Sequence, residues 1–160
     1  MKKTLLGIMS GSSLDGLDLA AASFTFSPDG SLLQWSLLKA GTLPLPEEWR
    51  RRLSRLPAAS ARELALADAQ FGRLLGQAAA RFLRKHPLKI DAVASHGDAV
   101  FHYPAEGLSL QIGDGAVIAA EAGCDVIDNF RMQDVSLGGE GAPLAAVADY
   151  HLFPDYSFLL

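Results

Sequence analysis

Cysteine is almost absent from this 160-residue chain, which contains only Cys124. A single cysteine excludes an internal disulfide and suits a reducing compartment, so we expect a cytoplasmic protein. No apolar run is long enough to cross a bilayer, and no small-residue cleavage site follows the N-terminus, so no membrane partner is expected. Positive charge is also scarce, because 14 Lys and Arg stand against 18 Asp and Glu. This balance argues against nucleic-acid binding, whose affinity comes mainly from cations that neutralise phosphates.

The overall composition is ordinary for one globular domain, with 49% hydrophobic and 20% charged residues. Its densest basic run, Arg50 to Arg52 with Arg55, flanks Trp49, Leu53 and Leu56 at helical spacing. We interpret this run as the solvated face of an amphipathic helix and not as an anion site.

The most informative segment is the turn within residues 7–18, where three glycines, three serines and two aspartates join two apolar runs. Glycine lets backbone N–H groups approach an anion and serine adds donors, so this composition predicts a phosphate site. Because carboxylates repel phosphate, Asp15 or Asp18 is expected to hold a divalent metal that bridges to it. A turn-capping role through backbone amides is the open alternative for both, above all for Asp18.

Three familiar site types fit this turn poorly. A P-loop needs Gly-Lys-Ser or Gly-Lys-Thr, and no lysine lies near these glycines. The turn joins two predicted strands, whereas a dinucleotide-binding turn and a nucleophile elbow both lead from a strand into a helix. A serine hydrolase built from Ser10 or Ser12 with His96 is disfavoured for the same reason.

The hydrophobic pattern predicts an α/β domain that opens with an antiparallel meander of three strands. A capping box at Ser60 to Glu63 starts the most regular helix, which ends at His86-Pro87. The polar, glycine-rich stretch 128–141 is expected to be a loop, and residues 156–160 to begin a strand of a truncated domain. The predicted strands are 5–9, 17–26, 31–40, 90–94, 108–112 and 126–127, and the other predicted helices are 46–57, 116–122 and 142–152.

Four motifs follow one another along the chain: Gly7-x-Met9-Ser10-Gly11-Ser12-Ser13-Leu14-Asp15-Gly16-x-Asp18, Ser95-His96-Gly97, Gln111-Ile112-Gly113-Asp114-Gly115-Ala116, and Phe130-Arg131-x-x-Asp134-Val135-x-x-Gly138-Gly139-x-Gly141-Ala142-Pro143-Leu144. Each motif is weak alone, but in this order they resemble the anhydro-N-acetylmuramic acid kinase family.

The resemblance implies the fold of the sugar kinase, Hsp70 and actin superfamily, in which two ribonuclease-H-like α/β domains enclose an active site. Residues 1–128 would then form the first domain with its ATP phosphate hairpin. Residues 129–155 would form a sugar-site loop and connecting helix, and residues 156–160 the start of the second domain. The independently predicted meander, helices and returning strands agree with the first ribonuclease-H-like half.

The implied activity is ATP-dependent phosphorylation of O6 of 1,6-anhydro-N-acetylmuramic acid, while water opens the anhydro ring. This reaction returns cell-wall sugar to metabolism, and ATP, Mg²⁺ and the amino sugar are its implied ligands. Members of the family tend to form homodimers, so a homodimer is the expected assembly.

The resemblance also implies roles for individual residues. It gives ATP binding to the first hairpin, namely Gly11, Ser12, Ser13, Leu14, Asp15, Gly16, Leu17 and Asp18, with Asp15 and Asp18 near the metal. It gives sugar binding to His96, Asp98, Arg131, Asp134 and Glu140. Two structural alternatives stay open: His96 hydrogen-bonded to neighbouring backbone, and a surface salt bridge between Arg131 and Asp134. Arg131 suits a carboxylate such as the lactyl group of muramic acid.

Several departures from the family pattern fall in the implied sugar site. Asp98 and Ala99 stand where the family usually has glutamine or histidine followed by threonine, Asn129 where it has aspartate, and Glu140 where it has glutamine. Carboxylates near a sugar that itself carries a carboxylate lower affinity by repulsion. A degenerate, non-catalytic member that binds an amino sugar or nucleotide is therefore the alternative function, and a related amino sugar an alternative substrate.

The family's catalytic base is an aspartate in a later Asp-Thr-Gly-Pro-Gly-Asn motif, which does not occur in these 160 residues. We therefore expect the base beyond Leu160 and no catalytic residue on this chain. Phosphoryl transfer needs nucleotide, metal and acceptor fixed together in a water-poor cleft. The chain alone is accordingly expected to show no kinase turnover.

Overall fold

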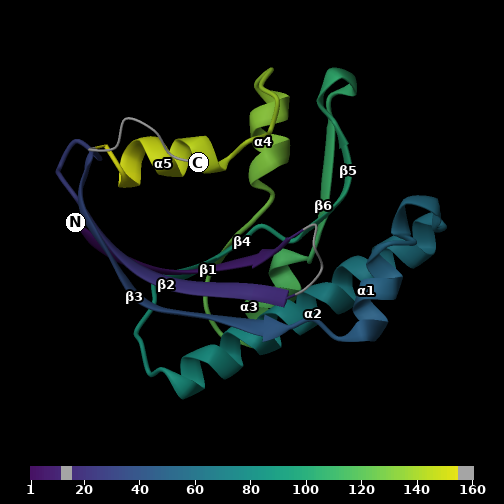
Figure 1. Cartoon of the computed structure of the whole chain (residues 1–160), viewed down its shortest axis with the longest axis horizontal. Coiled ribbons are helices and arrows are strands. Elements are labelled where there is room, and N and C mark those ends of the chain that lie inside the picture. Colours follow the sequence, from purple (N-terminus) through teal and green to yellow (C-terminus); the bar gives the residue numbers. More distant parts are fainter. Residues whose placement is uncertain (12–15, 155–160) are drawn as a thin grey trace.

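The computed structural model describes residues 1–11 and 16–154 and shows a mixed α/β arrangement (Figure 1). Three long strands open the chain: β1 (Lys2–Ser10), β2 (Gly16–Phe26) and β3 (Leu32–Pro44). Helices α1 (Glu47–Leu53), η1 (Leu56–Ala58) and α2 (Ala61–Lys85) follow, and then β4 (Ala92–Ser95), β5 (Asp98–Tyr103), η2 (Pro104–Glu106) and β6 (Leu108–Ile112). The described part ends with α3 (Gly115–Ala122), β7 (Val126–Ile127), α4 (Phe130–Ser136) and α5 (Ala145–Leu152).

The main sheet has the strand order β3-β2-β1-β4-β7, and β5 pairs with β6 in a separate hairpin. The first three strands form the predicted antiparallel meander, in which Ile8 lies opposite Leu19. β4 then joins β1 in parallel, and β7 joins β4 in parallel. An antiparallel meander extended by parallel strands after helical crossovers is the ribonuclease-H-like arrangement, so the predicted fold class is confirmed.

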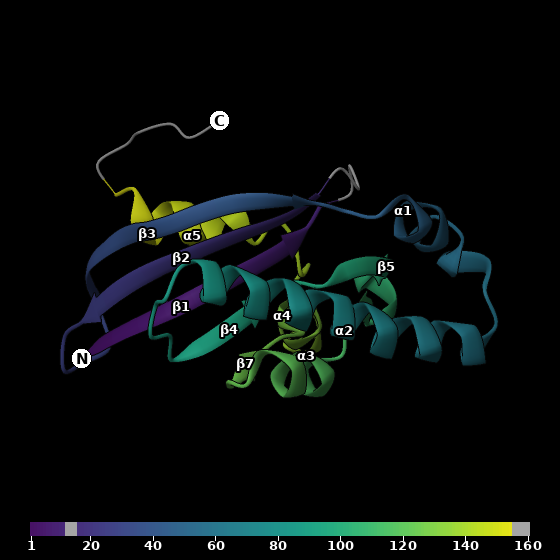
Figure 2. The same cartoon turned by 90° about the horizontal axis from the view of Figure 1, so that it is seen from below.

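Helix α2 supplies most of the core on one face of the sheet (Figure 2). The Ser60 side chain accepts a hydrogen bond from the Glu63 amide at 3.2 Å, as the predicted capping box requires. Phe71 and Leu75 are fully buried against alternate residues of the strands, such as Leu6 and Leu19. Burying each such side chain contributes roughly 2 kcal/mol, so this interface fixes the position of the sheet.

Helices α4 and α5 lie on the opposite face from α2 and α3 (Figure 1). The indole Nε1 of Trp35 donates to the Leu152 carbonyl at 2.9 Å, and the Trp35 and Phe153 rings meet edge to face at 5.5 Å. These contacts hold the end of α5 against β3. No helix in the described part is long and apolar enough to span a membrane.

The basic run of α1 behaves as predicted. Arg51 and Arg55 are exposed, and Arg51 lies 3.9 Å from Glu47 of the same helix. The apolar side of α1 packs inward, where Trp49 contacts the Phe71 ring at 5.0 Å.

Two segments differ from the sequence expectation. The stretch predicted as a loop contains helix α4, which begins after Asn129 in the left-handed region (φ 58°) and buries Val135. Residues 98–103 form strand β5, which the sequence pattern did not predict. The strand expected to begin at Tyr156 lies outside the described residues.

Candidate functional site

Three segments that contain predicted site residues meet at one edge of the sheet. The parallel strands β1, β4 and β7 end at Ser10, Ser95 and Ile127. Each end leads directly into a predicted site segment, namely the hairpin 11–18, residues 96–98 and residues 129–131. Ligands of open α/β sheets bind outside the carboxyl ends of the parallel strands, so the topology brings three distant parts of the chain to one place.

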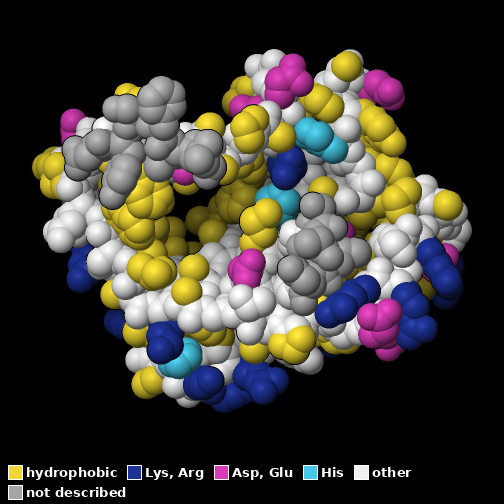
Figure 3. Space-filling view, viewed as in Figure 1, with side chains coloured by type: hydrophobic (Ala, Val, Ile, Leu, Met, Phe, Trp, Pro, Cys, Tyr) yellow, Lys and Arg dark blue, Asp and Glu magenta, His cyan; other side chains and the backbone are white. Residues whose placement is uncertain are grey.

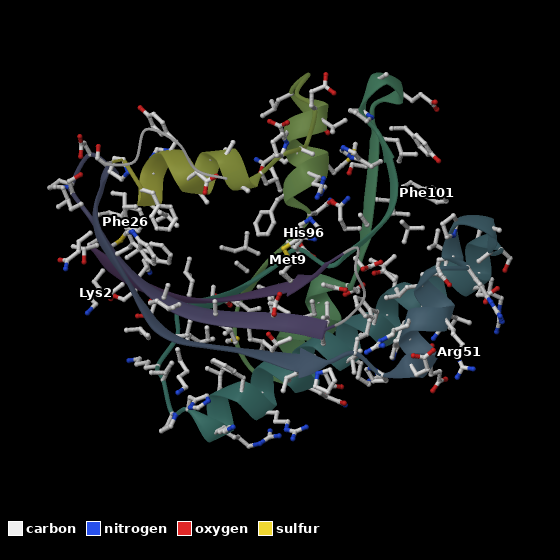
Figure 4. The ribbon with its side chains drawn as sticks, viewed as in Figure 1. Lys2, Met9, Phe26, Arg51, His96 and Phe101 are labelled. Atoms are coloured by element: carbon white, nitrogen blue, oxygen red, sulfur yellow. The ribbon has the colours of Figure 1, made fainter. Side chains whose placement is uncertain are left out.

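A cavity of about 320 Å³ lies at this edge, and we refer to it as the edge cavity. Figure 4 shows Met9 and His96 close together there, between the end of β1 and α4. A larger hollow of about 850 Å³, around Lys3, Phe26 and Ile127, contains none of the predicted site residues. The described residues that line the edge cavity are Met9, Ser10, Leu53, Ser54, Pro57, His96, Asp98, Ala99 and Arg131.

His96 and Arg131 form a directional pair in this cavity. Arg131 Nε donates to His96 Nε2 at 2.9 Å, and His96 Nδ1 lies 3.1 Å from the Gly97 carbonyl oxygen. An arginine N–H can only donate, so Nε2 is the acceptor, and the proton of the neutral ring sits on Nδ1 and points to Gly97. Burial lowers the pKa of His96, and the charge of Arg131 lowers it further, against the opposing effect of the Gly97 carbonyl. Figure 3 shows a basic side chain touching histidine on this face.

The position of His96 is compatible with both a structural role and a place in the sugar site. The ring bonds the neighbouring backbone, as the structural alternative held, and it also lies in the cavity and orients the guanidinium. Arg131 Nη1 approaches the Gly141 carbonyl at 3.5 Å, which leaves its other N–H groups for a ligand. A guanidinium held in this way is suited to a carboxylate or phosphate oxygen.

Asp98 forms the acidic side of the edge cavity. It is only 8% exposed, and its Oδ1 accepts a hydrogen bond from Ser10 Oγ at 3.0 Å. Burial raises the pKa of this carboxyl, and the Ser10 hydrogen bond partly opposes the rise. Asp98 has no ion-pair partner within the described ranges 1–11 and 16–154. Ser10 also lines the edge cavity, and the sequence analysis did not include it among the candidate binding residues although the first motif contained it.

Gly97 sets the directions of His96 and Asp98. Its φ is +68°, and a Cβ there would lie 2.3 Å from the Ile112 carbonyl oxygen. The chain must turn sharply between β4 and β5 while β6 approaches closely, and only glycine fits both demands.

Asp134 and Glu140 do not face the edge cavity. The Asp134 Oδ2 accepts a hydrogen bond from the Gly141 amide at 2.7 Å, and its carboxyl group packs on Gly139. The predicted alternative, an Arg131–Asp134 salt bridge, is not among the ion pairs of the residues that the structure describes. Asp134 therefore anchors the glycine-rich loop after α4, and Glu140 is an exposed residue of that loop.

The predicted phosphate hairpin is described only in part, since Ser12, Ser13, Leu14 and Asp15 lie outside the described residues. Leu17 is 2% exposed in the core, so its side chain is structural and only its backbone is suited to bind a ligand. Gly16 is tightly packed, because a Cβ there would lie 2.6 Å from Thr42 Cγ2 and 3.0 Å from the Leu43 carbonyl oxygen. Gly11 directly follows Ser10 of the edge cavity.

Asp18 is exposed and accepts a hydrogen bond from Thr42 Oγ1 at 2.6 Å. Among the described residues, the partner of Asp18 is thus a side chain of β3, and the amides of residues 12–15 that a turn cap would use lie outside the described part of the chain. Asp18 lies directly opposite Met9, which puts it one strand away from the edge cavity on the same face.

Among the described residues, no three His, Cys, Asp or Glu side chains lie close enough together to hold a metal ion. Magnesium carried by a nucleotide needs only one or two protein carboxylates in addition to the phosphates. The exposed carboxylate of Asp18 therefore fits a nucleotide-borne magnesium, and it does not form a metal cage by itself.

A second cavity of about 270 Å³ adjoins His96 on the side of α2 and α3. Two of its three acidic residues have hydrogen-bond partners: the Asp114 side chain caps α3 by accepting from Val117 N at 2.9 Å, and Asp68 Oδ1 accepts from Gly113 N at 2.7 Å. The carboxyl group of the third, Asp128, packs on Gly115. Burial is the main reason why the pKa of Asp68 is raised, with the charge of Asp114 adding to the rise. The predicted polar helix start at Asp114 is thus a helix cap.

The strand order defines this chain as a ribonuclease-H-like α/β domain. The family model "Anhydro-N-acetylmuramic acid kinase" matches residues 3–158. The chain therefore belongs to the anhydro-N-acetylmuramic acid kinase family.

Individual relatives agree with this family. An anhydro-N-acetylmuramic acid kinase of Mannheimia succiniciproducens is 39% identical over 161 residues, covering 96% of this chain and 41% of that protein. One of Pseudomonas putida is 38% identical over 154 residues, covering 92% of this chain and 40% of that protein. The chain thus spans about two-fifths of the length of these curated relatives. Among solved structures, Thermus thermophilus RuvC aligns with a TM-score of 0.42 at 18% identity, over 95% of this chain and 80% of RuvC.

Proposed function

We propose that this chain is the part of an ATP-dependent sugar kinase that holds the phosphates of ATP and one side of the sugar. The reaction is phosphorylation of O6 of 1,6-anhydro-N-acetylmuramic acid, with water opening the anhydro ring. One observation supports this proposal above the others. Ser10, which immediately precedes the phosphate hairpin, hydrogen-bonds Asp98 inside the cavity that contains Arg131. Phosphoryl transfer requires the site of the phosphate donor, ATP, to adjoin the site of the acceptor sugar, as the hairpin and the edge cavity do.

In this proposal the two sites have separate tasks. The backbone and hydroxyl groups of residues 11–18 would hold the phosphates, and the carboxylates of Asp15 and Asp18 would hold the magnesium ion that the nucleotide carries. Bound magnesium neutralises charge on the transferring phosphoryl group. Arg131, oriented by His96, binds the carboxylate of the sugar, and Asp98 accepts a hydrogen bond from one of its hydroxyl or N–H groups.

Asp134 and Glu140 contribute through the loop after α4. Asp134 fixes the shape of this loop through Gly141, and the same glycine carries the carbonyl that Arg131 approaches. We propose that Glu140 approaches the sugar from the loop. A cytoplasmic location and a homodimer remain predictions.

The catalytic base is proposed to come from a part of the protein outside these 160 residues, as in the family motif described above. Residues 1–160 alone are therefore expected to transfer no phosphate from ATP to the sugar. Transfer catalysed by this chain alone would refute that expectation.

A non-catalytic sugar- or nucleotide-binding member is the second candidate. The observation that favours it is Asp98, a buried acid at a position where the family usually carries a neutral or basic side chain. The two candidates differ in turnover and not in binding.

The test uses the protein at its full natural length with ATP, Mg²⁺ and 1,6-anhydro-N-acetylmuramic acid. We expect a sugar 6-phosphate, detected by mass spectrometry as a gain of one phosphoryl group (HPO₃) and one water. Asp15→Asn should abolish turnover while sugar binding persists. Binding of both ligands without any product would favour the non-catalytic candidate instead, and unchanged turnover of Asp15→Asn would refute the metal role.

A further inference from the structure

We propose that Asp98 is a specificity-determining residue, which lowers the preference of the edge cavity for a sugar that carries a carboxylate over a neutral sugar that presents O–H or N–H donors. This inference rests on the proposed function and goes beyond it, because it concerns which amino sugar is preferred.

The edge cavity contains one acidic and one basic group that do not neutralise each other. Asp98 and Arg131 both line it, yet no ion pair joins them in the described part of the chain. Each has a neutral partner instead, Ser10 for Asp98 and His96 for Arg131. A ligand therefore meets a hydrogen-bond acceptor on one side and a guanidinium on the other.

The edge cavity is small enough for a bound anion to interact electrostatically with both Asp98 and Arg131. A space of about 320 Å³ is about 8.5 Å across if taken as a sphere, so any carboxylate inside it lies within a Debye length of Asp98. Arg131 attracts such a carboxylate and Asp98 repels it. With a neutral side chain at position 98, only the attraction would remain.

Asp98 attracts the hydrogen-bond donors of the sugar, whereas it repels a carboxylate. A carboxylate accepts hydrogen bonds more strongly than an amide, and the Ser10 hydroxyl already holds Asp98 in place. A hydroxyl or acetamido N–H directed at Asp98 thus gains from the acid. The net preference shifts from the lactyl-bearing sugar toward its neutral analogue.

The experiment compares two sugars that differ in the lactyl group, 1,6-anhydro-N-acetylmuramic acid and 1,6-anhydro-N-acetylglucosamine. Their Kd values are measured by calorimetry on the protein at its full natural length, at about pH 8, well above the usual carboxyl pKa. Asp98→Asn keeps an Oδ1 acceptor for Ser10 and removes the charge. We expect the ratio of Kd values, acidic sugar over neutral sugar, to fall about tenfold in this variant, the factor that corresponds to 1.4 kcal/mol.

Glu106→Gln is the matched control, since it removes one negative charge from the same hairpin at an exposed position outside the cavity. It should leave the ratio unchanged. Asp98→Gln, which restores a residue usual in the family, should act like Asp98→Asn and replaces it if the asparagine variant does not fold.

Two contrary outcomes are distinguishable. If both sugars bind and Asp98→Asn changes the two Kd values by the same factor, the specificity role is overturned and the proposed function stands. If neither sugar binds the wild-type protein, the proposed function and this inference both fail.

Discussion

Gly97→Ala tests whether the turn between β4 and β5 shapes the edge cavity. Gly97 has a φ of +68°, and an added Cβ would lie 2.3 Å from the Ile112 carbonyl oxygen. Left-handed backbone costs an alanine about 1 kcal/mol. A clash with backbone, which cannot rotate away as a side chain can, adds about 2 kcal/mol. We therefore expect the free energy of unfolding to fall by about 3 kcal/mol in total.

Gly107→Ala separates these two contributions. Gly107 has nearly the same φ, +70°, but an added Cβ there meets nothing within 4 Å. Its substitution should cost only the backbone part, about 1 kcal/mol. Equilibrium urea unfolding followed by circular dichroism measures both variants at one temperature. Sugar affinity should fall in Gly97→Ala alone, because Gly97 joins His96 to Asp98.

Equal losses of stability in Gly97→Ala and Gly107→Ala would refute the reasoning, because the close approach of β6 to Gly97 would then contribute nothing to the loss. A loss of stability in Gly97→Ala without any change in sugar affinity would refute the link between the turn and the cavity.

Three further predictions concern titration and helix capping. Asp98→Asn should raise the free energy of unfolding at neutral pH, because burial raises the folded-state pKa of Asp98 and the charged carboxylate destabilises the fold. This gain in stability should disappear as the pH falls to the ordinary carboxyl pKa, and a gain that persists in acid would contradict the prediction. Stability should decline as the pH falls below 6.5, the ordinary histidine value, because the folded-state pKa of His96 is lowered and the unfolded chain takes up the proton first. Sugar affinity should decline only at lower pH, where Nε2 of the folded protein is protonated and cannot accept from Arg131. His96→Gln should remove this decline, as measured by calorimetry over a pH series, and an unchanged decline would assign it to another group. Ser60→Ala should lower the free energy of unfolding by about 1 kcal/mol in urea, because α2 loses its N-cap, and a change near zero would argue against the cap.

Elements with strong local signals could be predicted from the sequence. The strands of the meander are apolar runs, the second and third of which are separated by a clear turn at residues 27–30, and the structure places β2 and β3 on either side of that turn. The capping box at Ser60 marks the start of α2 because the cap is formed by residues three apart. Local patterns of this kind do not depend on the rest of the molecule.

Helix α4 could not be predicted because its stability comes from distant contacts. The helix has only seven residues and no side-chain cap at its start, and glycines follow it closely. Its Arg131 is held by His96, 35 residues earlier in the chain. Short helices are only marginally stable without such tertiary contacts. The glycine-rich composition of this stretch therefore favoured the prediction of a loop over that of a helix.

The sequence placed His96, Asp98 and Arg131 in one site, and the structure brings these three residues into the edge cavity, but their contacts could not be predicted. Motifs identified Arg131 and His96, and the topology brought them together. The hydrogen bond between Ser10 and Asp98 joins residues 88 positions apart, which no spacing rule reveals. Asp134 was expected at the sugar, whereas its carboxyl group holds Gly141, because a short side chain beside a tight loop bonds the nearest free amide.

The central claim is that the edge cavity binds the sugar while the adjoining hairpin binds ATP. The most direct test is to measure KM for each substrate in Arg131→Gln of the protein at its full natural length. We predict that KM for 1,6-anhydro-N-acetylmuramic acid rises at least tenfold, about 1.4 kcal/mol, while KM for ATP stays unchanged. An unchanged sugar KM, or an equal rise in both constants, would contradict the claim.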